Sequence, residues 1–116
     1  MNVVIVDDHG VLRDGLRQLL ERHADIRVVA CEKDARNGVG AVLRLQPDVV
    51  VMDISMPGMS GIDAARAIVE GAPRTAVLML SVFASPDTVV EAFHAGARGY
   101  VLKSSLGDEV VEAVRA

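Results

Sequence analysis

Acidic side chains stand directly after two of the apolar runs in this 116-residue sequence. Asp7 and Asp8 follow the first run, and Asp53 follows the third. A hydroxyl, Ser81, and an amine, Lys103, come directly after the fourth and fifth runs. Clustered carboxylates repel one another and require a cation, and an open site of oxygen ligands suits Mg²⁺ better than Ca²⁺. Because a carboxylate beside Mg²⁺ and a lysine can attack a phosphoryl group, these residue types predict phosphoryl-group chemistry if the fold brings them together.

Each of these residues, taken singly, also has a simpler interpretation. Asp7 and Asp8 could start a turn and cap the next helix, and Asp53 could be a turn residue. Ser81 could be an ordinary loop hydroxyl, and Lys103 could be a solvated side chain. For a single residue the simpler interpretation is favoured. Because four separate strand ends each supply a residue type that the same chemistry needs, the joint interpretation is the stronger one.

Five short, valine-rich apolar runs predict the strands that must position these residues. Continuous β-branched runs are typical of strands buried on both faces of a parallel sheet. Segments with helical spacing of apolar residues separate the runs, so the pattern predicts an α/β protein with five β-α pairs. The best-matching architecture is a flavodoxin-like (βα)5 doubly wound parallel sheet with strand order 2-1-3-4-5, in which the first and third strands are neighbours. The predicted strands are residues 3–6, 26–31, 49–52, 75–80 and 99–102.

Helix start signals support the intervening helices. Ser60 and Ser105 each begin an [ST]-x-x-[DE] capping pattern, and Ser85 stands before a proline, which is favoured at the first helical position. The helix expected over residues 34–46 is the weakest, because Gly38 and Gly40 lower its helix propensity. The apolar stripes of the other helices fall within residues 12–20, 62–69, 89–93 and 106–114.

Composition limits the class of protein. The chain is 51% hydrophobic and 24% charged with a net charge of −4, which predicts one globular domain. It has no basic lobe and is only 3% aromatic, so these residues are not expected to contact nucleic acid. A single cysteine, Cys31, cannot form an internal disulfide. No signal peptide or apolar run long enough to span a membrane is evident, so we expect no membrane association and a cytoplasmic location.

Four stretches of the sequence resemble the receiver domain of two-component response regulators, in the CheY-like superfamily. They are VIVDDH at residues 4–9, DVVVMDISMPGMSG at 48–61, Leu80-Ser81, and AGARGYVLK at 95–103. The resemblance covers the whole chain, so residues 1–116 are expected to form one receiver domain, and it is closest to the LuxR/NarL type. Full-length members of that type carry a DNA-binding helix-turn-helix domain downstream, which is absent from these residues.

The resemblance implies a phosphorylatable signalling switch with a Mg²⁺ cofactor and no enzymatic turnover beyond its own phosphorylation and dephosphorylation. By residue, it implies that Asp53 is the phosphoacceptor. Asp8 and Asp53 would ligate Mg²⁺ together with the backbone carbonyl of Ser55, and Asp7 would act through a water molecule. The Ser55 position would also tune the lifetime of the acyl phosphate.

The same resemblance assigns the groups that read the phosphate. Ser81 and Lys103 would bind the phosphoryl group, and Ser81 and Tyr100 would form the switch. Val82 and Phe83 occupy positions that tune the site; Val82 replaces an alanine common in relatives and could narrow access to it. A sensor histidine kinase would be the phosphodonor, and a homodimer is expected on phosphorylation. The signal would pass through the surface of the fourth helix, fifth strand and fifth helix to control transcription.

The same residues allow two other classes of function. An aspartyl-phosphate phosphatase would use Asp7 or Asp8 as the nucleophile, but such hydrolases usually show D-x-D, whereas these acids are adjacent. A binding module is the other class. An FMN carrier needs a hydroxyl-rich phosphate loop after the first strand, where Asp7 and Asp8 would repel the phosphate. A receiver domain that works without phosphorylation also remains open.

Overall fold

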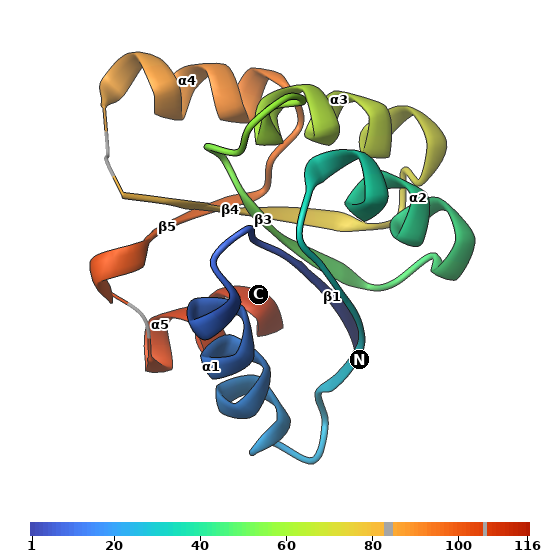
Figure 1. Cartoon of the computed structure of the whole chain (residues 1–116), viewed down its shortest axis with the longest axis vertical. Coiled ribbons are helices and arrows are strands. Elements are labelled where there is room, and N and C mark those ends of the chain that lie inside the picture. Colours follow the sequence, from blue (N-terminus) through green and yellow to red (C-terminus); the bar gives the residue numbers. More distant parts are fainter. Residues whose placement is uncertain (83–84, 106) are drawn as a thin grey trace.

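The computed structural model describes residues 1–82, 85–105 and 107–116. Its centre is a five-stranded parallel sheet in the order β2-β1-β3-β4-β5 (Figure 1). The predicted fold class and strand order are therefore confirmed. The strands are β1 (Asn2–Val6), β2 (Arg27–Glu32), β3 (Val49–Asp53), β4 (Ala76–Ser81) and β5 (Gly99–Leu102).

Helices cover both faces of the sheet. In Figure 1, α2, α3 and α4 lie above it, and α1 and α5 lie below it. A short 3₁₀ helix, η1 (Lys103–Ser105), follows β5. No helix of the described residues is long and apolar enough to cross a membrane. The helices are α1 (Gly10–Glu21), α2 (Ala35–Leu45), α3 (Gly61–Gly71), α4 (Pro86–His94) and α5 (Asp108–Arg115).

Both faces of the central strands are buried, which explains why their sequences lack polar alternation. In β1, Val4 and Val6 face the apolar layer beneath α2 and α3. Val3 and Ile5 face the opposite layer, which they share with α1 and α5. All four side chains are fully buried. Alternate residues of one strand thus hold two helical layers together, and the strand ends are left as the place for polar groups.

The predicted helix starts were partly right. The Ser60 hydroxyl accepts the backbone N–H of Asp63 at 3.2 Å and caps α3 as predicted. Ser85 occupies the N-cap position of α4, without a side-chain cap bond within the described part of the chain. The prediction for Ser105 was wrong: it lies in η1, and Gly107 is the N-cap of α5. Gly107 has φ of 138°, a conformation that favours glycine. Leu106 of the predicted stripe lies outside the described residues.

The two glycines of α2 have different environments. A Cβ atom on Gly38 would lie 2.6 Å from Cγ2 of Val6, so the missing side chain lets α2 pack closely on β1. A Cβ atom on Gly40 would meet nothing within 4 Å. Gly38 is buried and Gly40 is exposed. The low helix propensity of this segment therefore has a packing reason at Gly38 only.

Alanine should separate these two roles. We expect Gly38→Ala to lower the free energy of unfolding by about 1–3 kcal/mol, because Val6 is fully buried and β-branched and has little room to move. Gly40→Ala is the matched control and should raise it by about 0.5–1 kcal/mol, as expected for an exposed helical site. Urea unfolding measures both changes. Equal effects of the two substitutions would contradict the close contact between α2 and β1.

Candidate functional site

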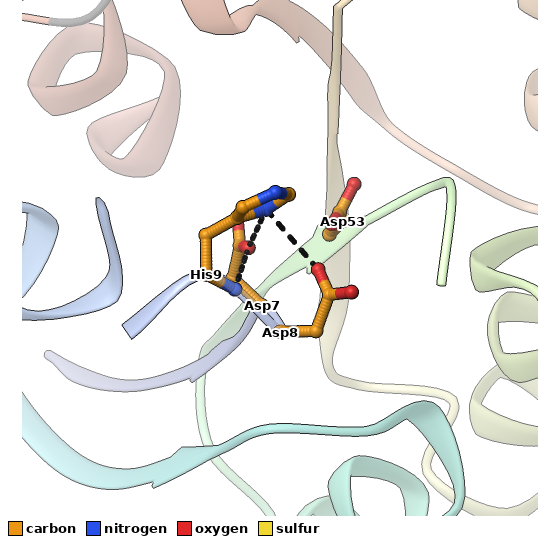
Figure 2. A group of neighbouring side chains, drawn as sticks. All are labelled: Asp7, Asp8, His9 and Asp53. Carbon is orange, nitrogen blue, oxygen red and sulfur yellow. Dashed lines mark hydrogen bonds and ion pairs between the residues drawn. The ribbon is translucent and has the colours of Figure 1, made fainter. Parts of the chain in front are cut away.

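The sheet order brings the acidic side chains to one place. β1 and β3 pair in parallel with Val6 opposite Met52, so the residues that follow or end these strands are neighbours. Figure 2 shows Asp7, Asp8, His9 and Asp53 around one space. Each of the four offers a ligand atom, and these atoms all lie within 4.8 Å of one another. A single metal ion can reach groups this close together. We call Asp7, Asp8, His9 and Asp53 the acidic pocket.

Lys103 enters the acidic pocket from the far edge of the sheet. It begins η1 directly after β5, and its Nζ lies 3.1 Å from Oδ2 of Asp53 and 3.2 Å from Oδ2 of Asp7. The side chains of Lys103, Asp7 and Asp53 are 12%, 0% and 2% exposed. One partly buried ammonium therefore faces two buried carboxylates. The structure therefore brings Asp7, Asp53 and Lys103, which were predicted at separate strand ends, into contact.

Backbone contacts hold Asp7 rigidly. Its N–H donates to the carbonyl of Glu32 at 3.0 Å, which extends the pairing of β1 with β2 by one residue. Its own carbonyl accepts Nη1 of Arg13 at 2.8 Å. Oδ1 of Asp7 accepts the backbone N–H of His9 at 2.8 Å. The first two contacts fix the backbone of Asp7, and the carboxylate cannot rotate without breaking the third.

The loop after β3 holds Asp53 in a similar way. Oδ1 of Asp53 accepts the backbone N–H of Ser55 at 3.2 Å. The N–H of Gly61 donates to the carbonyl of Ile54 at 3.1 Å, which closes the loop. A Cβ atom on Gly61 would collide with the backbone oxygen of Asp53, so only glycine lets the first turn of α3 approach so closely. Gly61 is thus a positioning residue for Asp53 that sequence reasoning did not identify.

The pocket has an unbalanced charge. Burial raises the pKa of Asp53, the charge of Asp7 raises it further, and Lys103 and the Ser55 N–H only partly oppose these effects. Burial lowers the pKa of Lys103, but its contacts with Asp53 and Asp7 outweigh burial and raise it overall. Oδ2 of Asp7 and Oδ2 of Asp53 lie within ion-pair distance of Lys103, yet neither accepts a hydrogen bond among the described residues. These buried oxygens fit a divalent cation, which would supply the missing positive charge.

The other predicted site residues lie around this centre. Asp8 stands at the rim with its side chain 31% exposed, and Ser55 is exposed on the loop. Ser81 is buried at the end of β4, opposite Leu102 of β5, and therefore lies between the strands that carry Asp53 and Lys103. Val82 is 62% exposed.

Two further predictions concern aromatic residues. Tyr100 lies on β5 opposite Met79 of β4 and is half-buried against the apolar layer beneath α3 and α4. Phe83, predicted as a tuning residue, lies outside the described residues. Tyr100 thus lies two residues before the end of β5, on the face of the sheet that α4 covers.

His9 and Arg13 were not assigned a role from the sequence. Nδ1 of His9 lies 3.2 Å from Oδ1 of Asp7 and 3.2 Å from Oδ1 of Asp8 (Figure 2). Arg13 follows one helical turn later and holds the Asp7 carbonyl. Their positions in the sequence could have indicated a role in the site. His9 directly follows Asp7 and Asp8, and Arg13 lies four residues after His9, on the first helix.

A five-stranded doubly wound sheet with an acidic pocket at the switch point defines a narrow class of α/β protein, and comparison with known proteins identifies it. The profile of the response regulator receiver domain matches residues 3–115. The chain therefore belongs to the response regulator receiver domain family. Transcriptional regulatory protein DegU of Brevibacillus brevis is 36% identical over 115 residues, which are 99% of this chain and 49% of DegU. The chain spans about half the length of the curated relatives it matches.

Solved structures agree with this assignment. The receiver domain of the putative response regulator NarL from Mycobacterium tuberculosis superposes with a TM-score of 0.94 at 34% identity, over 98% of this chain and 92% of that one. RcsB from Salmonella enterica, bound to promoter rprA in the presence of the phosphomimetic BeF3−, superposes with a TM-score of 0.90 at 28% identity, over 100% of this chain and 66% of RcsB. The predicted resemblance to LuxR/NarL-type receiver domains is confirmed. Receiver domains are signalling switches, which argues against the phosphatase and FMN-carrier hypotheses.

The buried charge of Asp53 should cost stability when no metal is bound. We expect Asp53→Asn to raise the free energy of unfolding in EDTA at neutral pH by about 1–2 kcal/mol, because the amide carries no charge for Asp7 to repel. Because the pKa of Asp53 is raised, the folded protein holds this proton to a higher pH than the unfolded chain does. The destabilisation caused by the buried Asp53 charge is therefore complete above the pKa of Asp53 in the folded protein. It disappears as the pH falls toward about 4.

Urea unfolding of both proteins in EDTA, at neutral pH and at about pH 4, measures this effect. Asp14→Asn, which removes an exposed carboxylate of α1, is the matched control and should change stability by less than about 0.5 kcal/mol. An Asp53→Asn variant no more stable than the wild type at neutral pH would contradict the unbalanced charge of the pocket.

Proposed function

We propose that this receiver domain is a phosphorylatable switch of a two-component system and that Asp53 accepts the phosphoryl group from a sensor histidine kinase. The observation that carries the proposal is the position of the Asp53 carboxylate, buried between Asp7 and the ammonium of Lys103. A carboxylate held beside a lysine and a cation site is suited to nucleophilic attack on phosphorus. Membership of the family supports the same chemistry.

Mg²⁺ is the proposed cofactor. Asp8 and Asp53 would hold the ion together with the backbone carbonyl of Ser55, and Asp7 would act through a water molecule. Oxygen ligands with few protein groups and several waters are typical of Mg²⁺. The bound ion supplies positive charge to the phosphoryl oxygens. The buried Oδ2 atoms of Asp7 and Asp53, which accept no hydrogen bond among the described residues, support a cation at this place.

In the transfer, a carboxylate oxygen of Asp53 forms a bond to phosphorus while the bond from phosphorus to the kinase histidine nitrogen breaks. The electron pair of that bond returns to the histidine. The Lys103 ammonium, 3.1 Å from Oδ2 of Asp53, then pairs with the new phosphoryl oxygens. The Ser81 hydroxyl, at the adjacent strand end, donates a hydrogen bond to one of them. These charge-assisted contacts hold the acyl phosphate in place.

Phosphorylation would change the surface formed by α4, β5 and α5. Ser81 moves toward the phosphoryl group, and Tyr100 turns inward and repacks this surface. If phosphorylation favours the active arrangement over the inactive one by about 5.5 kcal/mol, the ratio of active to inactive molecules changes from 1:99 to 99:1. Ser55, Val82 and Phe83 tune the lifetime of the acyl phosphate and access to it.

The proposed output is control of transcription from the cytoplasm. Relatives named as transcriptional regulators are about twice as long as this chain, which leaves room for a downstream helix-turn-helix domain. The RcsB structure contains promoter DNA. With a net charge of −4, these residues are not expected to contact DNA, so they would act through that domain and through a homodimer formed on phosphorylation.

Phosphorylation can be tested with acetyl phosphate and Mg²⁺, followed by intact-mass measurement. We expect the wild type to gain one phosphoryl group, because Asp53, 3.1 Å from the Lys103 ammonium, is the one proposed acceptor. Asp53→Asn and EDTA should each abolish the gain. Asp14→Asn, which removes an exposed carboxylate outside the pocket, should be phosphorylated like the wild type. A phosphorylated Asp53→Asn protein would contradict the proposed acceptor, and no gain with any donor would favour a receiver that works without phosphorylation.

The switch can be followed through the only tyrosine in the sequence, because the chain has no tryptophan. We expect phosphorylation to change the fluorescence of Tyr100 in the wild type. Ser81→Ala should still be phosphorylated on Asp53 but lose most of the fluorescence change. Ser104→Ala, an exposed serine in η1, is the control and should respond normally. A Ser81→Ala protein with the full fluorescence change would show that Ser81 does not couple the phosphate to Tyr100.

A further inference from the structure

We propose that Arg115 and Asp25 form a latch that holds α5 in place over the sheet and limits its local opening. The latch joins α5 to the turn between α1 and β2, two parts of the chain that are 90 residues apart in the sequence. It lies at the edge of the sheet where the strands begin, whereas the acidic pocket lies where they end. The inference therefore goes beyond the proposed function and does not depend on phosphorylation of Asp53.

The first observation is the geometry of the ion pair. Nε of Arg115 donates to Oδ2 of Asp25 at 3.0 Å, and Nη2 donates to Oδ1 at 2.8 Å. One planar guanidinium therefore binds both carboxylate oxygens, which fixes the direction of both side chains. The pKa of Asp25 is lowered, chiefly by the hydrogen bond from Arg115. Among the ion pairs of the described residues, no other joins α5 to a different part of the chain.

The second observation is that the turn before β2 holds Asp25 ready for this contact. The carbonyl of Asp25 accepts the N-terminal ammonium of Met1 at 2.9 Å. The N–H of Ile26 donates to the carbonyl of His23 at 3.0 Å. Nδ1 of His23 also lies 3.2 Å from Nη2 of Arg115, where a neutral ring can accept a hydrogen bond. Because the fold already fixes the partner of Arg115, less conformational entropy is lost when the latch closes.

The third observation is the packing around α5. Helices α1 and α5 cover the same face of the sheet (Figure 1), and α5 is attached to it by three buried valines, Val110, Val111 and Val114. The N-cap of α5 is Gly107, which has no side chain to cap the helix. A surface groove of about 500 Å³ lies beside this N-cap, lined by Gly107 and by side chains between Val11 and Arg22. A helix with such a start opens locally more easily than the packed core, so the contact at Arg115 matters for its position.

The exposure of the two side chains sets the expected size of the effect. Arg115 and Asp25 are 44% and 55% exposed. Exposed ion pairs contribute little to stability, but a bidentate pair of arginine and carboxylate is the geometry in which the contribution is measurable. Breaking the latch should therefore speed the local opening of α5 by about two- to fivefold. The proposed function uses α5 as part of its output surface, so the latch would limit how far that surface changes.

Amide hydrogen exchange of the whole chain, followed by NMR at constant neutral pH without metal or phosphodonor, tests the inference. We expect Asp25→Asn to speed the exchange of the Ala113 and Val114 N–H groups by about two- to fivefold, because the amide has no charge and one acceptor oxygen fewer. Asp63→Asn is the matched control. Asp63 pairs with Arg66 at 3.2 Å within α3 and is 59% exposed, so its loss should leave exchange in α5 unchanged.

A double-mutant cycle shows whether the two residues act through one contact. Arg115→Gln alone should speed exchange in α5 about as much as Asp25→Asn does, and the double variant should exchange no faster than either single variant. Unchanged exchange in α5 of Asp25→Asn would overturn the inference. A double variant in which the two single effects multiply would also overturn it, because the residues would then act independently.

Phosphorylation of the same variants with acetyl phosphate separates this inference from the proposed function. If Asp53 is phosphorylated but exchange in α5 ignores Asp25, the proposed function stands and the latch is wrong. If Asp53 is never phosphorylated but exchange in α5 depends on Asp25 and Arg115 as one unit, the latch stands and the proposed function is wrong.

Discussion

Repulsion between carboxylates brought together at one edge of a parallel sheet is the constraint on which this structure depends. Asp7 and Asp53 are almost fully buried, Asp8 stands beside them, and a single ammonium faces the two buried acids. Burial and the neighbouring charge both raise the pKa of Asp53. A pocket in this state holds more negative charge than the protein neutralises, and it is therefore prepared for a cation and then for a phosphoryl group.

The rest of the fold keeps this unfavourable arrangement in place. β1 and β3 lie at the centre of the sheet and are buried on both faces, so their ends cannot separate without exposing the apolar core. The backbone carbonyl of Glu32 and the side chain of Arg13 hold the backbone of Asp7, and Gly61 allows α3 to close the loop after Asp53. Polar groups that are only partly satisfied persist where the surrounding core is well packed, and they mark functional sites in many proteins.

The sequence was sufficient to predict the framework, since each valine-rich run corresponds to one strand, and the residue after a run lies at the pocket edge of the sheet. The ends of β2 and β4 were displaced by one residue, because strand boundaries depend on pairing with neighbours. Ser105 was predicted to cap α5 because no local pattern revealed η1 before it. The close approach of Gly38 to Val6 is a contact between distant segments. The close approach of Gly61 to Asp53 and the ring direction of His9 depend on the conformation of the loops after β3 and β1, which spacing along the chain does not encode.

The most direct test is the pKa of Asp53 itself, measured through its carboxyl ¹³C chemical shift in metal-free wild type and in Asp7→Asn. If the acids share one desolvated pocket, the pKa of Asp53 lies above the ordinary value of about 3.9 in the wild type and falls when the charge of Asp7 is removed. An ordinary pKa that is the same in both proteins would contradict the account, because Asp53 would then feel neither the burial nor the neighbouring charge.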